Sequence, residues 1–176
     1  DSNIKKINNL NNQKAHIFTN IGCILLFKKL LKTFHYSNNY HFKHVEVKNL
    51  NQYTVYDIGH IEGILNHYIT HGSTCIYPFG IVYTRPEKTN ILSNVELSYK
   101  WLNVCNDANW IKNKNNKYLN CGKCTKCTRT LFILEIFKCL EKYKDIFNLN
   151  NYFNIKQMHK NELVEKKNIS WVKEIF

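Results

Sequence analysis

Three cysteines form a short block whose spacing suits a metal ion. Cys121, Cys124 and Cys127 are separated by two residues each, in the sequence CGKCTKC. Gaps of this length let the thiolates converge on one ion, and Gly122 tolerates the unusual backbone angles of such a turn. A tetrahedral site needs a fourth ligand, and Cys105 completes the pattern C-x15-C-x2-C-x2-C. We therefore predict that Cys105, Cys121, Cys124 and Cys127 bind a structural Zn²⁺.

Other interpretations of the block stay open on sequence alone. The cysteines could hold an iron–sulfur centre with Cys139 as the fourth ligand, could be ordinary buried thiols, or could form a disulfide after oxidation. The chain has seven cysteines, which is an odd number, and shows neither a disulfide-rich spacing nor a signal peptide. We therefore expect a reducing, cytoplasmic environment.

Four basic side chains outside the block are candidates for contact with an anion or a substrate. Arg85 and Lys88 follow a predicted strand at the start of a predicted helix, where helix N-termini attract anions. Arg129 comes just after the cysteines, and His60 shares its segment with two further histidines. For each of the four, a structural or solvent-exposed role stays open.

The composition narrows the class of protein. The chain has 176 residues, of which 44% are hydrophobic, so it can bury a core, and its longest apolar runs meet charge too early to span a bilayer. The formal net charge is +12, yet only two basic residues are arginines. Lysine and asparagine are abundant in proteins from AT-rich genomes, so the charge reflects either composition or a basic face. Clustering of the charge would favour a polyanion partner.

The periodicity of the sequence predicts an α/β protein. Helical spacing covers residues 15–34, 86–101 and 128–143, while strands are expected at 42–47 and 74–77. Residues 145–157 give a weaker helical pattern, and the Asn- and Lys-rich stretch before Cys121 is expected to be a loop that closes back on the metal. Alternation of helices and strands favours α/β packing.

The cysteine block also resembles a known family. The segment Asn120–Thr130 with the following Leu131–Glu135 resembles the signature NCGxCxKCxRT…LE of a bacterial PP-loop-like family related to 7-cyano-7-deazaguanine synthase. Leu102–Cys105 resembles the segment that supplies this family's earlier cysteine. Gly80–Lys88 resembles its step from strand into helix, and Asp1–Ile4 resembles the DSNL that follows its N-terminal half.

This resemblance implies the C-terminal portion of a Rossmann-like ATP pyrophosphatase fold, with a four-cysteine zinc knuckle leading into a long helix. Such enzymes activate a substrate oxygen with ATP, release pyrophosphate, and let a nitrogen nucleophile displace AMP. The family's phosphate-binding loop, S-G-G-x-D-S, is absent from this sequence. We expect part of an ATP-dependent ligase or synthase that is inactive without its other half, which would bind ATP and Mg²⁺ and lie on the same chain or another.

The expected organisation is a partial Rossmann-like region over residues 1–104, a zinc-binding loop and helix over 105–143, and a helical or irregular tail over 144–176. The alternative function is a non-enzymatic, basic, zinc-binding module that contacts RNA or DNA. A small-molecule or peptide substrate and a homodimer also stay open as partners, whereas a membrane is not expected.

Overall fold

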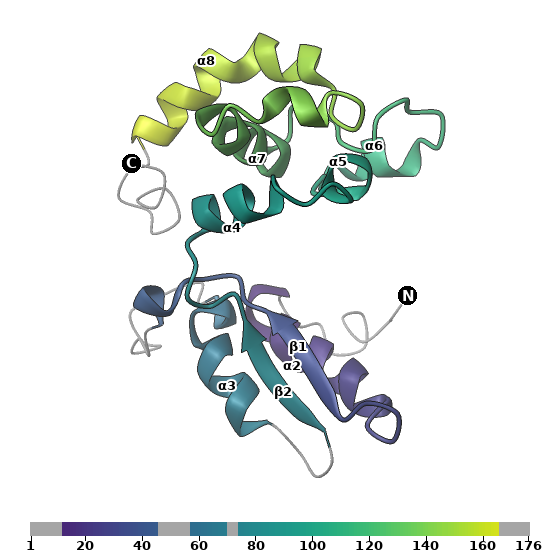
Figure 1. Ribbon diagram of the computed structural model, residues 1–176, viewed down its shortest axis with the longest axis vertical. Helices are drawn as coiled ribbons and strands as arrows, with labels where there is room; N and C mark the ends of the chain where they lie inside the picture. The colour runs from purple at the N-terminus through teal and green to yellow at the C-terminus, as the bar shows by residue number, and fades with distance from the viewer. Residues whose placement is uncertain (1–11, 46–56, 70–73, 166–176) are drawn as a thin grey trace. The chain divides into compact units, whose positions relative to one another are not determined.

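The computed structural model describes residues 12–45, 57–69 and 74–165. The chain divides into two compact units, Asp1–Thr84 and Arg85–Phe176, which are described separately (Figure 1). The sequence predicts that residues 85–104 belong to a first region over residues 1–104, whereas in the structure they belong to the second unit. Among the helices in these ranges, none combines the length and the apolar character needed to cross a membrane.

The first unit is a small α/β structure. Its elements are, in order, α2 (Asn12–Leu26), β1 (Thr33–Ser37), the 3₁₀ turns η1 (Phe42–His44) and η3 (Ile58–Ile61), α3 (Glu62–Tyr68) and β2 (Cys75–Phe79). The two strands pair in parallel, with Thr33 opposite Cys75 and Ser37 opposite Phe79. Figure 1 shows α2 and α3 beside this sheet. The predicted α/β class is therefore confirmed at the level of a two-stranded parallel sheet.

Helix α2 ends earlier than its apolar spacing predicts. Ile17, Ile21 and Ile24 lie three or four residues apart and form the buried face of the helix, against β1 and β2. Beyond them, Leu26 and Leu30 are 82% and 80% exposed, so they add nothing to that face. The prediction of a helix to residue 34 was wrong, because Thr33–Ser37 instead pairs with a strand about forty residues away in sequence.

A second expected element also differs. The strand predicted over residues 42–47 is wrong for its first half, since Phe42–His44 forms the turn η1, in which Nδ1 of His41 accepts a hydrogen bond from the backbone of Lys43. Residues 46 and 47 lie outside the described residues. The strand predicted over residues 74–77 is confirmed for residues 75–77, since β2 spans Cys75–Phe79.

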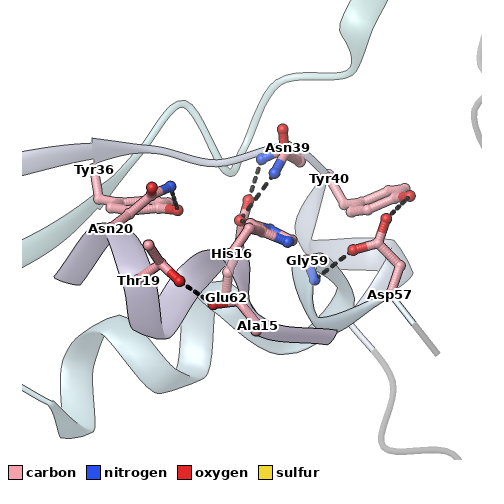
Figure 2. Close-up of polar contacts among 10 residues, drawn as sticks. All are labelled: Ala15, His16, Thr19, Asn20, Tyr36, Asn39, Tyr40, Asp57, Gly59 and Glu62. Carbon is pink, nitrogen blue, oxygen red and sulfur yellow. Dashed lines mark hydrogen bonds and ion pairs between the residues drawn. The ribbon is translucent and has the colours of Figure 1, made fainter. Parts of the chain in front are cut away.

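A buried carboxylate joins three segments of the first unit. Glu62 begins α3 and is 1% exposed. It accepts hydrogen bonds from the backbone N–H of Asn39 and from Nδ2 of Asn39 (3.1 Å), and Nε2 of His16 on α2 lies 3.8 Å from Oε2 (Figure 2). Burial raises the pKa of Glu62, although Asn39 and His16 oppose the rise. The carboxyl group is therefore harder to ionise in the folded unit than in the unfolded chain.

Stability of the first unit should consequently depend on the ionisation of Glu62. Because its pKa is raised on folding, its contribution is fully present at low pH, where both states are protonated, and is lost as pH rises through the folded pKa. Each unit of pKa difference corresponds to about 1.4 kcal/mol. We expect wild-type stability to fall relative to Glu62→Gln between acidic and neutral pH, as measured by chemical denaturation. A difference that stays constant with pH would contradict this.

The regular elements described in the second unit are helices and a 3₁₀ turn, joined by loops, with one isolated β-bridge between Asn120 and Phe147. Its elements are α4 (Arg85–Leu92), α5 (Ser98–Trp101), α6 (Ala108–Lys112), α7 (Thr125–Ile136), the 3₁₀ turn η4 (Leu140–Tyr143) and α8 (Leu149–Glu165). Tyr143 is at the centre of its core: the ring packs edge-on against Tyr99 and Phe147, and the hydroxyl lies 2.7 Å from Oγ of Ser98. This packing explains why residues 85–104 belong to the second unit.

Three helices of this unit differ in extent from the prediction. The helix expected over 86–101 is two helices, α4 and α5, separated by turns. The helix expected over 128–143 starts at Thr125 and stops at Ile136, because Lys138 takes a positive φ of 57° and Cys139 N–H bonds the carbonyl of Leu134. The weakly helical stretch becomes the 17-residue helix α8, the longest described.

Candidate metal centre

The predicted cysteines come together within the second unit. Cys121 and Cys124 lie in the turn before α7, Cys124 occupies the N-cap position of that helix, and Cys127 is in its first turn. Cys105 reaches the same point from the far end of the loop that contains α6. All four Sγ atoms lie within 4.8 Å of one another, and they form the one such ligand group among the described residues.

The spacing of the sulfurs fits a single tetrahedral ion. The Sγ atoms of Cys121 and Cys127 are 3.8 Å apart, and those of Cys105 and Cys124 are 4.0 Å apart. Four thiolates at about 2.3 Å from a tetrahedral Zn²⁺ would be separated by about 3.8 Å. Both distances are far longer than a disulfide bond of about 2.05 Å. The donor set and its geometry are thus compatible with a structural metal.

The tight turn at the cysteines requires a glycine. Gly122 has a φ of +74°, in the left-handed region that favours glycine. A Cβ atom at this position would lie 2.0 Å from the backbone oxygen of Asn148, which immediately precedes α8. The turn therefore packs directly on the start of α8. Nδ2 of Asn151 strengthens this contact by donating to the carbonyl of Cys121 at 2.9 Å.

Asn120 holds the two parts of the cluster together. Its buried Oδ1 accepts hydrogen bonds from the backbone N–H of Val104 (2.8 Å) and Cys105 (3.1 Å). Its Nδ2 donates to the carbonyls of Leu102 (2.8 Å) and Ile146 (3.2 Å). One amide group thus satisfies four backbone groups from two distant segments. Because Asn120 directly precedes Cys121, these bonds place Cys105 beside the other three cysteines.

Without a bound metal, the pKa values of three of the clustered thiols differ from one another. Burial raises the pKa of Cys121 to about 11, and burial also raises the pKa of Cys127 well above its usual range. Burial opposes ionisation of Cys124 too, but hydrogen bonds from the backbone of Asn106 and Cys127 lower its pKa to about 7. A cysteine binds a metal as its thiolate, so a bound cation would supply the charge that favours ionisation of the buried Cys121 and Cys127.

Of the other predicted site residues, three belong to the second unit and one to the first. Arg85 and Lys88 are half-buried in the first turn of α4, a helix that packs against α7. Arg129 is half-buried in α7, two residues after Cys127. His60 belongs to the first unit, where its ring stacks on Tyr40 at 4.2 Å. Within the described part of the chain, the fold thus brings the four cysteines together. No substrate contact is established for the four basic side chains.

The first unit has a hollow between α2 and β1, which extends along the strand to its carboxyl end. It measures about 470 Å³, and the residues lining it include His16, Asn20 and Cys23 from α2. Tyr36 of β1 and Asn39, just beyond the strand, line the opposite side, and Nδ2 of Asn20 donates to the Tyr36 hydroxyl at 3.0 Å (Figure 2). Ligands of parallel α/β sheets commonly bind outside the carboxyl ends of the strands.

Sequence reasoning missed the supporting asparagines. Asn120 belongs to the cysteine motif, but its residue type predicts no particular role there, and no pattern in the sequence distinguishes Asn148 and Asn151 from the other asparagines. Their importance arises from contacts between segments far apart in sequence. In a chain this rich in asparagine, only the position of Asn120 directly before the first cysteine of the block offered a signal.

Comparisons of the chain with protein family models, with curated proteins and with solved structures find no match. The chemistry of the cysteine cluster is therefore the main basis for a functional proposal.

Proposed function

We propose that Cys105, Cys121, Cys124 and Cys127 bind one Zn²⁺ with a structural role in the second unit. The observation that carries the proposal is the convergence of four Sγ atoms within 4.8 Å, with two of the separations, 3.8 and 4.0 Å, close to those of a zinc tetrahedron. Four protein thiolates leave no open coordination position for a substrate, which is typical of structural rather than catalytic zinc.

The geometry favours a single ion over an iron–sulfur cluster. A cluster of several irons and sulfides would separate its thiolate ligands further than one ion does, whereas these sulfurs are already at single-ion distances. Cys139, the ligand of the iron–sulfur alternative, lies outside the group, and its Sγ donates to the carbonyl of Phe137 at 3.2 Å. We therefore favour zinc over iron–sulfur chemistry.

Elemental analysis of the purified chain tests this proposal. We expect about one zinc per chain and no acid-labile sulfide, because the four thiolates form one closed site. Removal of the metal with a strong chelator should abolish cooperative unfolding of the second unit, as followed by circular dichroism, and adding Zn²⁺ should restore it. Stoichiometric iron with sulfide, or a metal-free protein with unchanged unfolding, would overturn the assignment.

We further propose that the chain is the C-terminal portion of an ATP-dependent PP-loop-type ligase or synthase. The resemblance of the cysteine block and of Gly80–Lys88 to that family supports the proposal. So do the parallel pairing of β1 with β2, linked through α3, and the hollow between α2 and β1, whose lining reaches the carboxyl end of β1 at Ser37 and Asn39. ATP and Mg²⁺ would bind to a phosphate-binding half that this sequence does not contain.

The coding sequence upstream of Asp1 gives a direct test of the enzyme proposal. A segment containing S-G-G-x-D-S there, in frame or in an adjacent gene, would supply the backbone N–H groups that hold pyrophosphate. The two parts expressed together should then exchange labelled pyrophosphate into ATP in the presence of substrate. An upstream sequence without such a loop would argue against a ligase.

A further inference from the structure

The positive charge of the second unit is concentrated in the segment that the cysteines close. Residues 105–130 contain six basic side chains and one acidic side chain. The rest of this unit's described residues, 85–104 and 131–165, contain eight basic and seven acidic side chains. Composition alone would spread lysines evenly over the unit. The clustering is therefore the feature expected of a basic face that meets a polyanion.

The lysines of this segment point to solvent. The exposed basic residues are Lys112, Lys114, Lys117, Lys123 and Lys126. The single acidic residue, Asp107, is already engaged, because its Oδ1 accepts from the backbone N–H groups of Asn109 and Trp110 at the start of α6. Figure 1 shows α6 and the loop after it projecting from the body of the second unit. With six basic side chains and one acidic one, the side chains of the segment carry a formal charge of +5 before any thiolate ionises.

The loop is also held in a defined shape. Nε1 of Trp110 donates to the carbonyl of Tyr118 at 3.2 Å, and Nδ2 of Asn116 donates to the carbonyl of Trp110 at 2.7 Å. Lys117 lies 5.3 Å from the centre of the half-buried Tyr118 ring. Lysines on an ordered loop beside an aromatic ring are elements with which proteins bind single-stranded nucleic acid, through phosphate contacts and base stacking.

We propose that the segment between Cys105 and Cys121, with α6 and the following loop, is a binding surface for single-stranded nucleic acid. Lys112, Lys114 and Lys117 would contact phosphates, and Tyr118 would offer a ring for a base. Lys123 and Lys126 lie on the cysteine turn itself, where they also offset the two negative charges of a zinc ion bound by four thiolates. The surface rests on the proposed metal site, which fixes both ends of the segment.

The test uses the full chain and labelled single strands of about 20 nucleotides, oligouridylate RNA and oligothymidylate DNA. Binding is measured by fluorescence anisotropy between about 50 and 200 mM salt. In the triple variant Lys112→Gln, Lys114→Gln, Lys117→Gln, we expect affinity to fall roughly tenfold or more and the salt dependence to flatten by about 2 in its log–log slope. The control variant is Lys28→Gln, Lys29→Gln, Lys32→Gln, which removes the same three charges from exposed lysines of the first unit.

Equal losses in the two triple variants would overturn the proposal, since net charge rather than this surface would then govern binding. Tight binding to phosphatidylserine vesicles without binding to either oligonucleotide would overturn it in favour of a membrane. Zinc content, measured on every variant, separates this proposal from the metal site. If the chain holds its zinc and the triple variant binds the oligonucleotides as tightly as the wild type, the binding surface is refuted and the metal site stands. If the purified chain holds no zinc and the triple variant still binds more weakly than the wild type, the metal site is refuted and the binding surface stands.

Discussion

Replacement of Cys124 by serine is expected to unfold the second unit. A serine hydroxyl is a poor zinc ligand, so Cys124→Ser would leave three thiolates and an open position where the sulfurs now lie within 4.8 Å. Structural zinc contributes apparent free energies of about 10–16 kcal/mol in small domains. The whole stability of a typical domain is only about 5–15 kcal/mol. We expect loss of bound zinc together with most of the helical signal of the second unit.

The matched control is Cys139→Ser in the same unit. Cys139 is half-buried and lies outside the cluster, and a serine hydroxyl can keep the bond that its Sγ makes to the Phe137 carbonyl. This variant should retain its zinc and shift the melting temperature by a few degrees at most. Circular dichroism and elemental analysis of both proteins provide the readout. A Cys124→Ser chain that melts like the wild type would show that the cluster has no structural role.

The cluster could be anticipated from sequence because its geometry is mostly local. Three of its ligands lie within seven residues, and a turn through Gly122 brings them together whatever surrounds them. The structure also brings Cys105 to the other three cysteines, as expected of a polar segment with a cysteine at each end that can close on an ion. The prediction missed α6 within that segment, a short helix begun by the Asp107 cap.

The elements that sequence reasoning placed wrongly depend on distant partners. The residues of β1 continue an apolar spacing that also suits a helix, and only pairing with β2 makes Thr33–Ser37 a strand. Helix α8 gave a weak pattern because it packs on α7 partly through polar contacts. The Tyr152 hydroxyl donates to Oε2 of Glu135 at 2.7 Å, and Lys156 pairs with the same carboxylate. Apolar periodicity cannot reveal such contacts.

Truncation of Asn120 to alanine is the second change from which we expect a large effect. Asn120→Ala leaves three backbone groups without these bonds: the N–H groups of Val104 and Cys105 and the carbonyl of Leu102. The Ile146 carbonyl loses the side-chain bond but keeps the one from the backbone N–H of residue 120 at 2.9 Å. Each buried polar group left unsatisfied costs about 1–3 kcal/mol. We expect a total loss of about 3 kcal/mol or more in the second unit, measured by chemical denaturation of the zinc-loaded protein.

Metal affinity should fall in the same variant, because Asn120 positions Cys105. Groups that orient metal ligands commonly affect affinity about 10–100-fold, and competition with a chromophoric chelator measures this separately from stability. The control Asn109→Ala replaces an exposed asparagine of α6 and should leave both the stability and the metal affinity nearly unchanged.

Asn120→Asp separates the two kinds of bond that Asn120 makes. It retains an acceptor for Val104 and Cys105 but turns a carboxylate toward two carbonyls. If Asn120→Asp binds zinc more tightly than Asn120→Ala, the acceptor bonds to the Cys105 segment govern the site. If the two variants bind zinc equally, the role of Asn120 lies in its donor bonds to Leu102 and Ile146.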